Sequence, residues 1–226
     1  MNRLFLLAAM SLLVGLFASP SHAALTPFKA DYSIRYRNIP ASAQLSLQPS
    51  GNNWMYQLTV GNAVASMSQA TVFMERGPYL VPLGGSDRMH YPGGSRAITT
   101  RYAWQDRQAR WTGDVKPKRA GPVELQRGDM DALLAQLALV RDHKAGRPAE
   151  YRVLENGKAR PTSFRRSGTE TITVAGQPVQ ATRYVQARTG KTTTIWVADN
   201  IPAPVRLTQM EGSRETIRMT LNSWTR

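Results

Sequence analysis

Apolar and polar residues alternate along most of the chain beyond residue 27. Phe28, Ala30 and Tyr32 begin a row of apolar side chains that continues through residues 34 and 36, and polar or charged residues occupy the positions between them. A period of two places successive side chains on opposite faces of a strand. The pattern therefore predicts a strand with one buried face and one wet face.

Similar alternation recurs over residues 43–60, 98–112, 151–153, 172–185, 193–197, 205–207 and 217–221. Turn-forming residues separate these segments, and the pair Asn156-Gly157 is a strong signal for a tight β-hairpin. The pattern predicts about eleven strands with short connections, which is typical of an antiparallel sheet.

The middle of the chain is less regular. It predicts a mixed apolar segment over residues 64–74 and a short strand over 79–83 that Pro82 limits. Glycine-rich sequence over residues 84–94 predicts a loop carrying His90 and Tyr91, and glycines and prolines over 113–122 predict another loop.

One segment has helical rather than strand periodicity. Leu133, Leu134, Leu137 and Val140 recur at helical spacing and form one apolar stripe. We expect a helix over about residues 129–143, with Asp129 as its N-cap. A lone amphipathic helix in a β protein must bury its stripe against a sheet.

These elements predict a mainly β fold. We expect residues 24–226 to form one antiparallel β domain, in which a large curved sheet wraps around the helix like a half-barrel. A β-sandwich of two sheets is the alternative that the pattern leaves open.

Residues 1–23 have the features of a secretory signal peptide. Arg3 precedes an apolar stretch, and small residues at Ser21 and Ala23 fit a cleavage site before residue 24. The apolar stretch is shorter than the roughly 20 residues that a membrane-spanning helix needs. No cysteine follows it, so we expect cleavage after Ala23 and a soluble periplasmic protein that is not a lipoprotein.

The formal net charge of +14 needs an explanation that fits export. Basic residues are spread along the chain, and their densest groups lie at 116–119 and 160–166. An exported protein meets anionic membrane surfaces and glycans rather than nucleic acid. We therefore expect no nucleic-acid partner, and peripheral rather than integral contact with a membrane.

The composition argues against most catalytic chemistry. The chain has no cysteine, which excludes disulfides and thiolate metal sites, and its histidines lack the spacing of a metal site, so we expect no metal and no cofactor. Nucleophile elbows and phosphate-binding loops are absent. A hydrolase with paired carboxylates remains an alternative, for which several acids are available: Glu75, Asp87, Asp106, Asp114, Glu124, Asp129 and Asp131.

Binding is the better prospect, because the chain carries five tryptophans. Trp104 and Trp111 flank a short turn that also holds Arg101, Arg107 and Arg110. An aromatic floor with a cationic rim suits an amphiphile with an anionic head, so these five residues form the candidate ligand site. The simpler alternative is that the tryptophans only fill the core of a curved sheet.

Three short motifs resemble an uncharacterised family of exported proteobacterial periplasmic β proteins, known as a domain of unknown function. They are the segments 28–32, 129–133 and 194–207, and the resemblance extends over nearly the whole chain after the signal peptide. It implies no activity and no catalytic residue. The layout is also similar, more loosely, to the curved sheets of periplasmic lipoprotein carriers, which is an analogy of fold only.

Together these observations predict a non-enzymatic periplasmic binding module for an apolar or amphipathic cell-envelope ligand. Its expected partners are a lipid, a glycolipid or another anionic envelope component. The alternatives are a structural or interaction protein, with a self-filled core and an envelope protein as partner, and an envelope hydrolase.

Overall fold

The computed structural model describes residues 25–226. The signal peptide predicted over residues 1–23 and its cleavage site lie outside this range. The described part contains sixteen strands, one 3-10 helix and one α-helix.

The first half of the chain forms β1 (Phe28–Tyr36), β2 (Ile39–Ser50), β3 (Asn53–Gly61), β4 (Ser66–Arg76), β5 (Tyr79–Tyr91), β6 (Gly94–Ala103), β7 (Gln108–Gly113), η1 (Pro117–Arg119), β8 (Val123–Glu124) and β9 (Asp129–Met130). The second half forms α1 (Ala132–Lys144), β10 (Glu150–Glu155), β11 (Lys158–Ser163), β12 (Arg165–Val174), β13 (Gln177–Arg188), β14 (Lys191–Val197), β15 (Arg206–Glu211) and β16 (Arg214–Thr225).

Thirteen strands form one antiparallel sheet in the order β12-β13-β14-β15-β16-β1-β2-β3-β4-β5-β6-β7-β8. The first and last long strands, β1 and β16, pair in its middle, so the two ends of the described part meet there. The sheet is not closed into a barrel, since β12 and β8 are its edges. It curls strongly enough that β12 also contacts β16.

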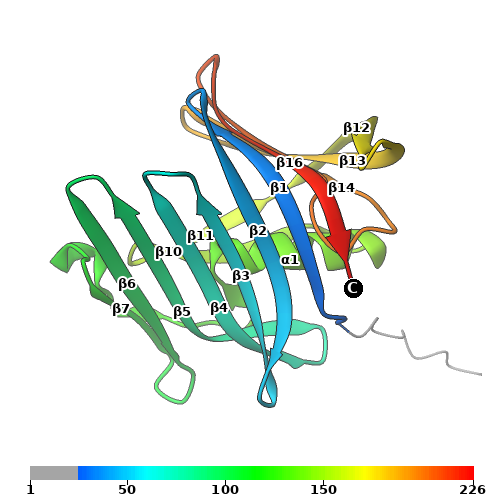
Figure 1. Cartoon of the computed structure of the whole chain (residues 1–226). Helices are drawn as coiled ribbons and strands as arrows, with labels where there is room; N and C mark the ends of the chain where they lie inside the picture. Colours follow the sequence, from blue (N-terminus) through cyan, green and yellow to red (C-terminus); the bar gives the residue numbers. More distant parts are fainter. Residues whose placement is uncertain (1–24) are drawn as a thin grey trace, which may run out of the picture.

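Helix α1 lies against the inner face of this curved sheet (Figure 1). Eight of its thirteen residues are buried, and the seven apolar ones join one hydrophobic core with residues from both wings of the sheet. This arrangement confirms the predicted fold class, a large curved antiparallel sheet with one helix, and not the sandwich alternative. The helix itself fills the centre of the concave side.

A second, three-stranded sheet closes one end of the concave side. Strands β10 and β11 form the predicted hairpin, in which Asn156 and Gly157 both have positive φ, and β9 adds to β10 in parallel. Between this small sheet and β6–β8 lies a second hydrophobic cluster, to which Tyr102, Trp111 and Leu154 belong.

Three local predictions were wrong. The helix begins at Ala132 with Asp131 as its N-cap, because the Asp131 side chain accepts a hydrogen bond from the Leu134 amide while Asp129 lies in β9. Residues 84–91 are not a loop but the second half of β5, which pairs with β4 and β6 despite its glycines. The number of strands is sixteen rather than eleven, since several are too short to show a pattern.

Candidate functional site

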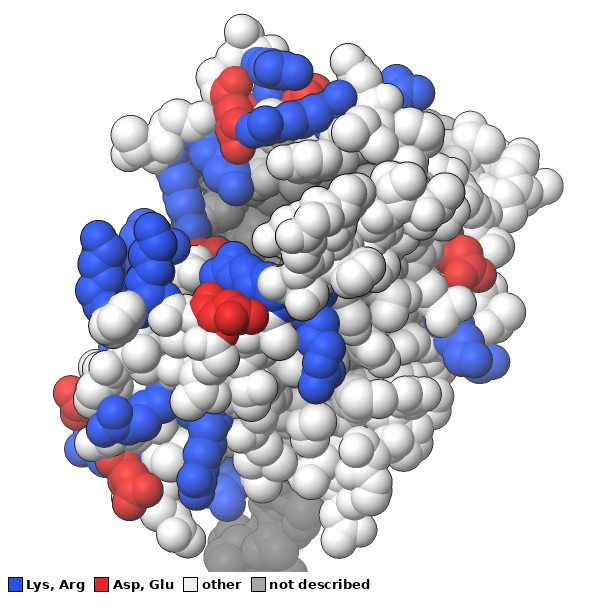
Figure 2. All heavy atoms as spheres, turned by 60° about the vertical axis from the view of Figure 1, so that its left-hand side comes forward, with Lys and Arg blue, Asp and Glu red and all other residues white. Residues whose placement is uncertain are grey.

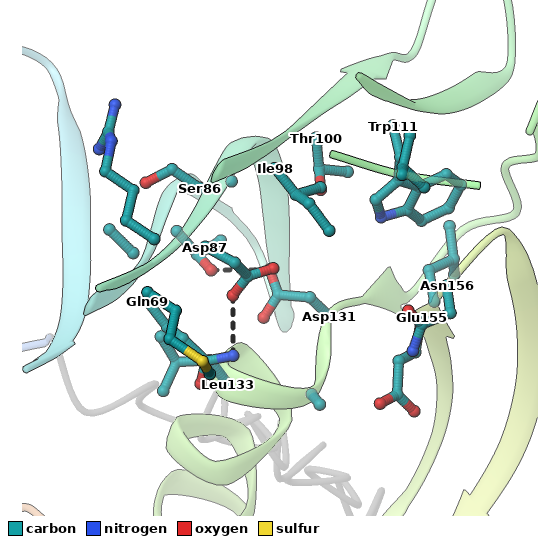
Figure 3. A pocket seen from close by; sticks show the side chains of 18 of the residues that line it. Gln69, Ser86, Asp87, Ile98, Thr100, Trp111, Asp131, Leu133, Glu155 and Asn156 are labelled. Carbon is teal, nitrogen blue, oxygen red and sulfur yellow. Dashed lines mark hydrogen bonds between the residues drawn. The ribbon is translucent and has the colours of Figure 1, made fainter. Parts of the chain in front are cut away.

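A cavity of about 240 Å³ opens between strands β4–β7 and the beginning of α1 (Figure 3). Two rows of side chains cross the strands on its sheet side. Residues that pair directly across strands point to the same face. One row joins Gln69, Asp87 and Ile98, and the other joins Thr71, Gly85, Thr100 and Trp111.

Two carboxylates supply the polar part of the cavity. Figure 3 shows both Asp87, from β5, and Asp131, from the start of α1, turned into it. The amide nitrogen of Gln69 donates to Asp87 Oδ1 at 2.7 Å. Burial raises the pKa of the Asp87 carboxyl, although the Gln69 hydrogen bond lowers it, so the charged form is less favoured there than in water.

Asp131 has a structural role as well as a place in the cavity wall. Its Oδ1 accepts from the backbone amide of Leu134 at 2.7 Å, and its Oδ2 accepts from the Thr71 hydroxyl at 2.7 Å. Burial raises the pKa of this carboxyl, the two hydrogen bonds lower it, and the nearby charge of Asp87 raises it further. Asp131 therefore fastens α1 to β4 at the position where the cavity opens.

Aromatic and aliphatic side chains form the remaining walls. Trp111 and Tyr102 lie on the inner face and are almost fully buried. Burial, and then the charges of Asp131 and Asp87, raise the pKa of the Tyr102 phenol, so it stays protonated as a hydrogen-bond donor. Met67 and Met89 pair across β4 and β5 and also line the cavity, and Met89 is exposed.

The two carboxylates favour a hydroxyl-bearing group, and Arg88 and Arg96, which also line the cavity, place positive charge beside them. Carboxylates accept hydrogen bonds, and aromatic walls pack against the apolar faces of a ring. The volume lies below the range of about 300–1,000 Å³ of most ligand sites. We therefore expect only one part of a larger ligand to enter.

The family described as "Protein of unknown function (DUF3108)" matches residues 31–222. The chain belongs to this family. The family resemblance predicted from the sequence is thereby confirmed, and its three motifs are found in β1, in the segment from β9 into α1, and from β14 into β15.

No curated protein matches this DUF3108 chain in sequence. Among solved structures, one that is similar to it is the Pseudomonas aeruginosa MucA/MucB complex, at 10% identity and a TM-score of 0.35. The likeness covers 88% of the DUF3108 chain and 51% of the matched chain, so the DUF3108 chain spans about half the length of that protein.

The structure separates the five residues that the sequence analysis grouped. Trp111 lines the cavity, and Trp104 is partly buried beside it, with its indole N–H donating to the Pro82 carbonyl at 2.7 Å. Arg101 and Arg110 pair with each other on the opposite, outer face of β6 and β7.

The third arginine, Arg107, lies in the exposed turn between these strands and forms an ion pair with Glu124 at 2.6 Å. The expected cationic rim around the tryptophans is therefore not formed. Arg101 precedes Tyr102 in β6 and Arg110 precedes Trp111 in β7, and neighbouring residues of a strand point to opposite faces.

Sequence reasoning did not single out Gly85, Asp87 and Asp131. Both acids stood among many candidates, and no spacing connects them. Gly85 had a readable signal, because a glycine inside a strand marks a place where another group approaches closely. That signal was lost when residues 84–94 were interpreted as a loop.

The surface charge of the DUF3108 chain is distributed rather than concentrated on the face seen in Figure 2. That figure shows Lys and Arg in small groups over much of this face, with Asp and Glu between them. No helix within residues 25–226 is long and apolar enough to cross a membrane.

Proposed function

We propose that this protein is an exported, non-enzymatic binding protein that holds an amphipathic cell-envelope ligand at the cavity beside α1. The observation that carries the proposal is the contrast within one hollow. Its lining combines the carboxylates of Asp87 and Asp131 with the apolar side chains of Met67 and Met89. A hydroxylated head group, such as a sugar ring of a glycolipid, would hydrogen-bond to the carboxylates.

The apolar part of such a ligand would continue outside the cavity. Two further apolar side chains, Val64 and Tyr91, are exposed at the same ends of β4 and β5 as Met89. Methionine adapts its shape to different apolar partners. Burial of ligand surface there contributes about 25 cal/mol per Å².

The test uses the full chain, exported with its own leader and purified from a bacterial periplasm. Native mass spectrometry of residues 24–226, before and after solvent extraction, should show a stoichiometric adduct of glycolipid mass. The same spectrum measures cleavage after Ala23. A clean mass that persists after incubation with envelope lipid extract would overturn the proposal and favour an interaction protein.

A pair of glycine variants locates the site. A Cβ at Gly85 would lie 3.5 Å from Thr100 Cβ, an ordinary contact, so a side chain can begin there without a clash, and Gly85→Val should reduce the volume of the cavity. Gly84→Val is the matched control, because Gly84 is the adjacent residue but does not line the cavity. The adduct should disappear in Gly85→Val and persist in Gly84→Val.

The acid pair also supports a second candidate function, glycoside hydrolysis, which needs two carboxyl groups in one cleft. Against it, both oxygens of Asp131 already accept hydrogen bonds from the protein. We therefore favour binding. Release of a reducing sugar from envelope glycans by the wild-type protein, and its loss in Asp87→Asn, would favour hydrolysis instead.

A further inference from the structure

A second and larger hollow lies at the other end of α1. It has a volume of about 800 Å³, within the range of sites for whole ligands. The end of α1, the loop after it, and strands β12 and β13 surround it. Its apolar lining includes the buried side chains of Phe164, Ala181 and Val197.

Half of the six acidic or basic side chains that line this groove are already paired within the protein. Arg147 donates to the buried Asp142 at 2.5 Å, and His143 Nε2 contacts Asp199 at 2.9 Å. The other ring nitrogen of His143 lies 3.1 Å from the Tyr184 hydroxyl, which holds the tyrosine ring in the groove wall.

Two arginines of the groove are different. Within residues 25–226, neither Arg165 nor Arg166 forms an ion pair with a carboxylate, and both are exposed. Arg166 pairs directly with Tyr184 across β12 and β13, so the two side chains share the inner face. One carboxylate of the groove, Glu150, also lacks an ion pair there, so the groups without a partner are two cations and one anion.

The backbone of β12 supports this placement of the arginines. The register between β12 and β13 shifts between Arg166 and Thr169, and Gly168 has a φ of +89°. Arg183 fixes the irregular segment by donating to the Ser167 carbonyl at 3.0 Å and to its hydroxyl at 3.2 Å. A bulge of this kind redirects the side chains next to it.

We propose that this groove binds the phosphate-bearing head group of an anionic lipid. Arg166 would hold the phosphate, because a guanidinium group matches its geometry, and Arg165 would add positive charge at the edge of the groove. The first part of the acyl chain would pack against Phe164 and the ring of Tyr184. The proposal concerns a different hollow from the cavity of Asp87 and Asp131 and does not depend on what that cavity binds.

The test is isothermal titration calorimetry of the full mature chain with dihexanoylphosphatidylglycerol below its critical micelle concentration. Dihexanoylphosphatidylcholine tests the need for net negative charge, and inorganic phosphate tests the need for an acyl chain. We expect binding of the phosphatidylglycerol that is at least about tenfold tighter than that of the other two, which is about 1.4 kcal/mol.

Three variants make the expectation directional. Arg166→Gln should weaken phosphatidylglycerol binding about tenfold, whereas Glu150→Gln should tighten it by removing a like charge. Arg214→Gln, at an exposed turn outside the groove, is the matched control and should leave the affinity within about twofold of wild type.

Circular dichroism of each variant should match wild type, because Arg166, Glu150 and Arg214 are all exposed. Equal affinity for phosphatidylglycerol and phosphatidylcholine, equal effects of Arg166→Gln and Arg214→Gln, or phosphate binding as tight as lipid would each overturn the proposal.

Discussion

Removal of the Asp131 side chain should destabilise the protein through two separate hydrogen bonds. Asp131→Ala takes away the N-cap of α1, which is typically worth about 1 kcal/mol. It also leaves the hydroxyl of Thr71, which is 2% exposed, without its acceptor. A buried polar group that loses its partner costs about 1–2 kcal/mol.

The two losses together are about 2–3 kcal/mol in the free energy of unfolding. In a protein of this size, 1 kcal/mol lowers the melting temperature by about 2–4 °C. We therefore expect Asp131→Ala to melt about 4–12 °C below wild type at low pH. At pH 7 the loss should be smaller, because the raised pKa of Asp131 shows that burial disfavours its charged form.

Asp131→Asn is the matched variant. Its side-chain oxygen can still cap Leu134 N, its amide can donate to the Thr71 hydroxyl, and it carries no charge. Its free energy of unfolding should therefore fall by less than about 1 kcal/mol at any pH.

Thermal unfolding followed by circular dichroism measures both variants, alone and combined with Thr71→Val. In the double-mutant cycle, Asp131→Ala should cost about 1–2 kcal/mol less in the Thr71→Val background, because the hydroxyl is already gone. Equal melting temperatures for the Ala and Asn variants, or strictly additive effects with Thr71→Val, would refute this account of the cavity wall.

Three further predictions concern the hairpin and the titrating groups. In chemical unfolding, Gly157→Ala should lower the free energy of unfolding by about 2–3 kcal/mol, and Gly190→Ala by only about 1 kcal/mol. Both glycines have positive φ, but only at Gly157 would an added Cβ meet backbone, 2.6 Å from Arg119 O. Asp87→Asn should melt about 1–2 °C above wild type at pH 7 and at the same temperature as wild type near pH 3. Burial raises the pKa of Asp87, so the folded protein holds the carboxyl proton more tightly than the unfolded chain does. The stability of wild type therefore falls as pH rises through that pKa. Burial lowers the pKa of His143, so the unfolded chain takes up this proton more readily and wild type should lose stability as pH falls below about 6.5. A melting series from pH 7 to pH 5 should show a smaller loss in His143→Gln, and an equal slope in both proteins would contradict this reading.

The strands were the most predictable part of the fold, because the alternation of apolar and polar side chains is a pattern of adjacent residues. Phe28, Ala30 and Tyr32 are buried as expected, although Tyr36 at the end of the row is exposed, and the Asn156-Gly157 turn forms its hairpin. The start of the helix was harder, since Asp129 and Asp131 are both good caps. Only a hydrogen bond to a particular amide, Leu134 N, distinguishes them.

The cavity could not be predicted in the same way, because it depends on the curvature of the whole sheet. Register shifts interrupt the pairing of β1 with β16, β4 with β5, β12 with β13 and β15 with β16. Each shift adds local twist and bend, and their sum decides how far the sheet folds around α1. Asp87 and Asp131 come close only through the curvature of the whole sheet, so no single segment of the sequence predicts that they are neighbours. Gly85 is the one local sign of the cavity in the sequence, because β5 carries no side chain at this position, where the strand lines the cavity.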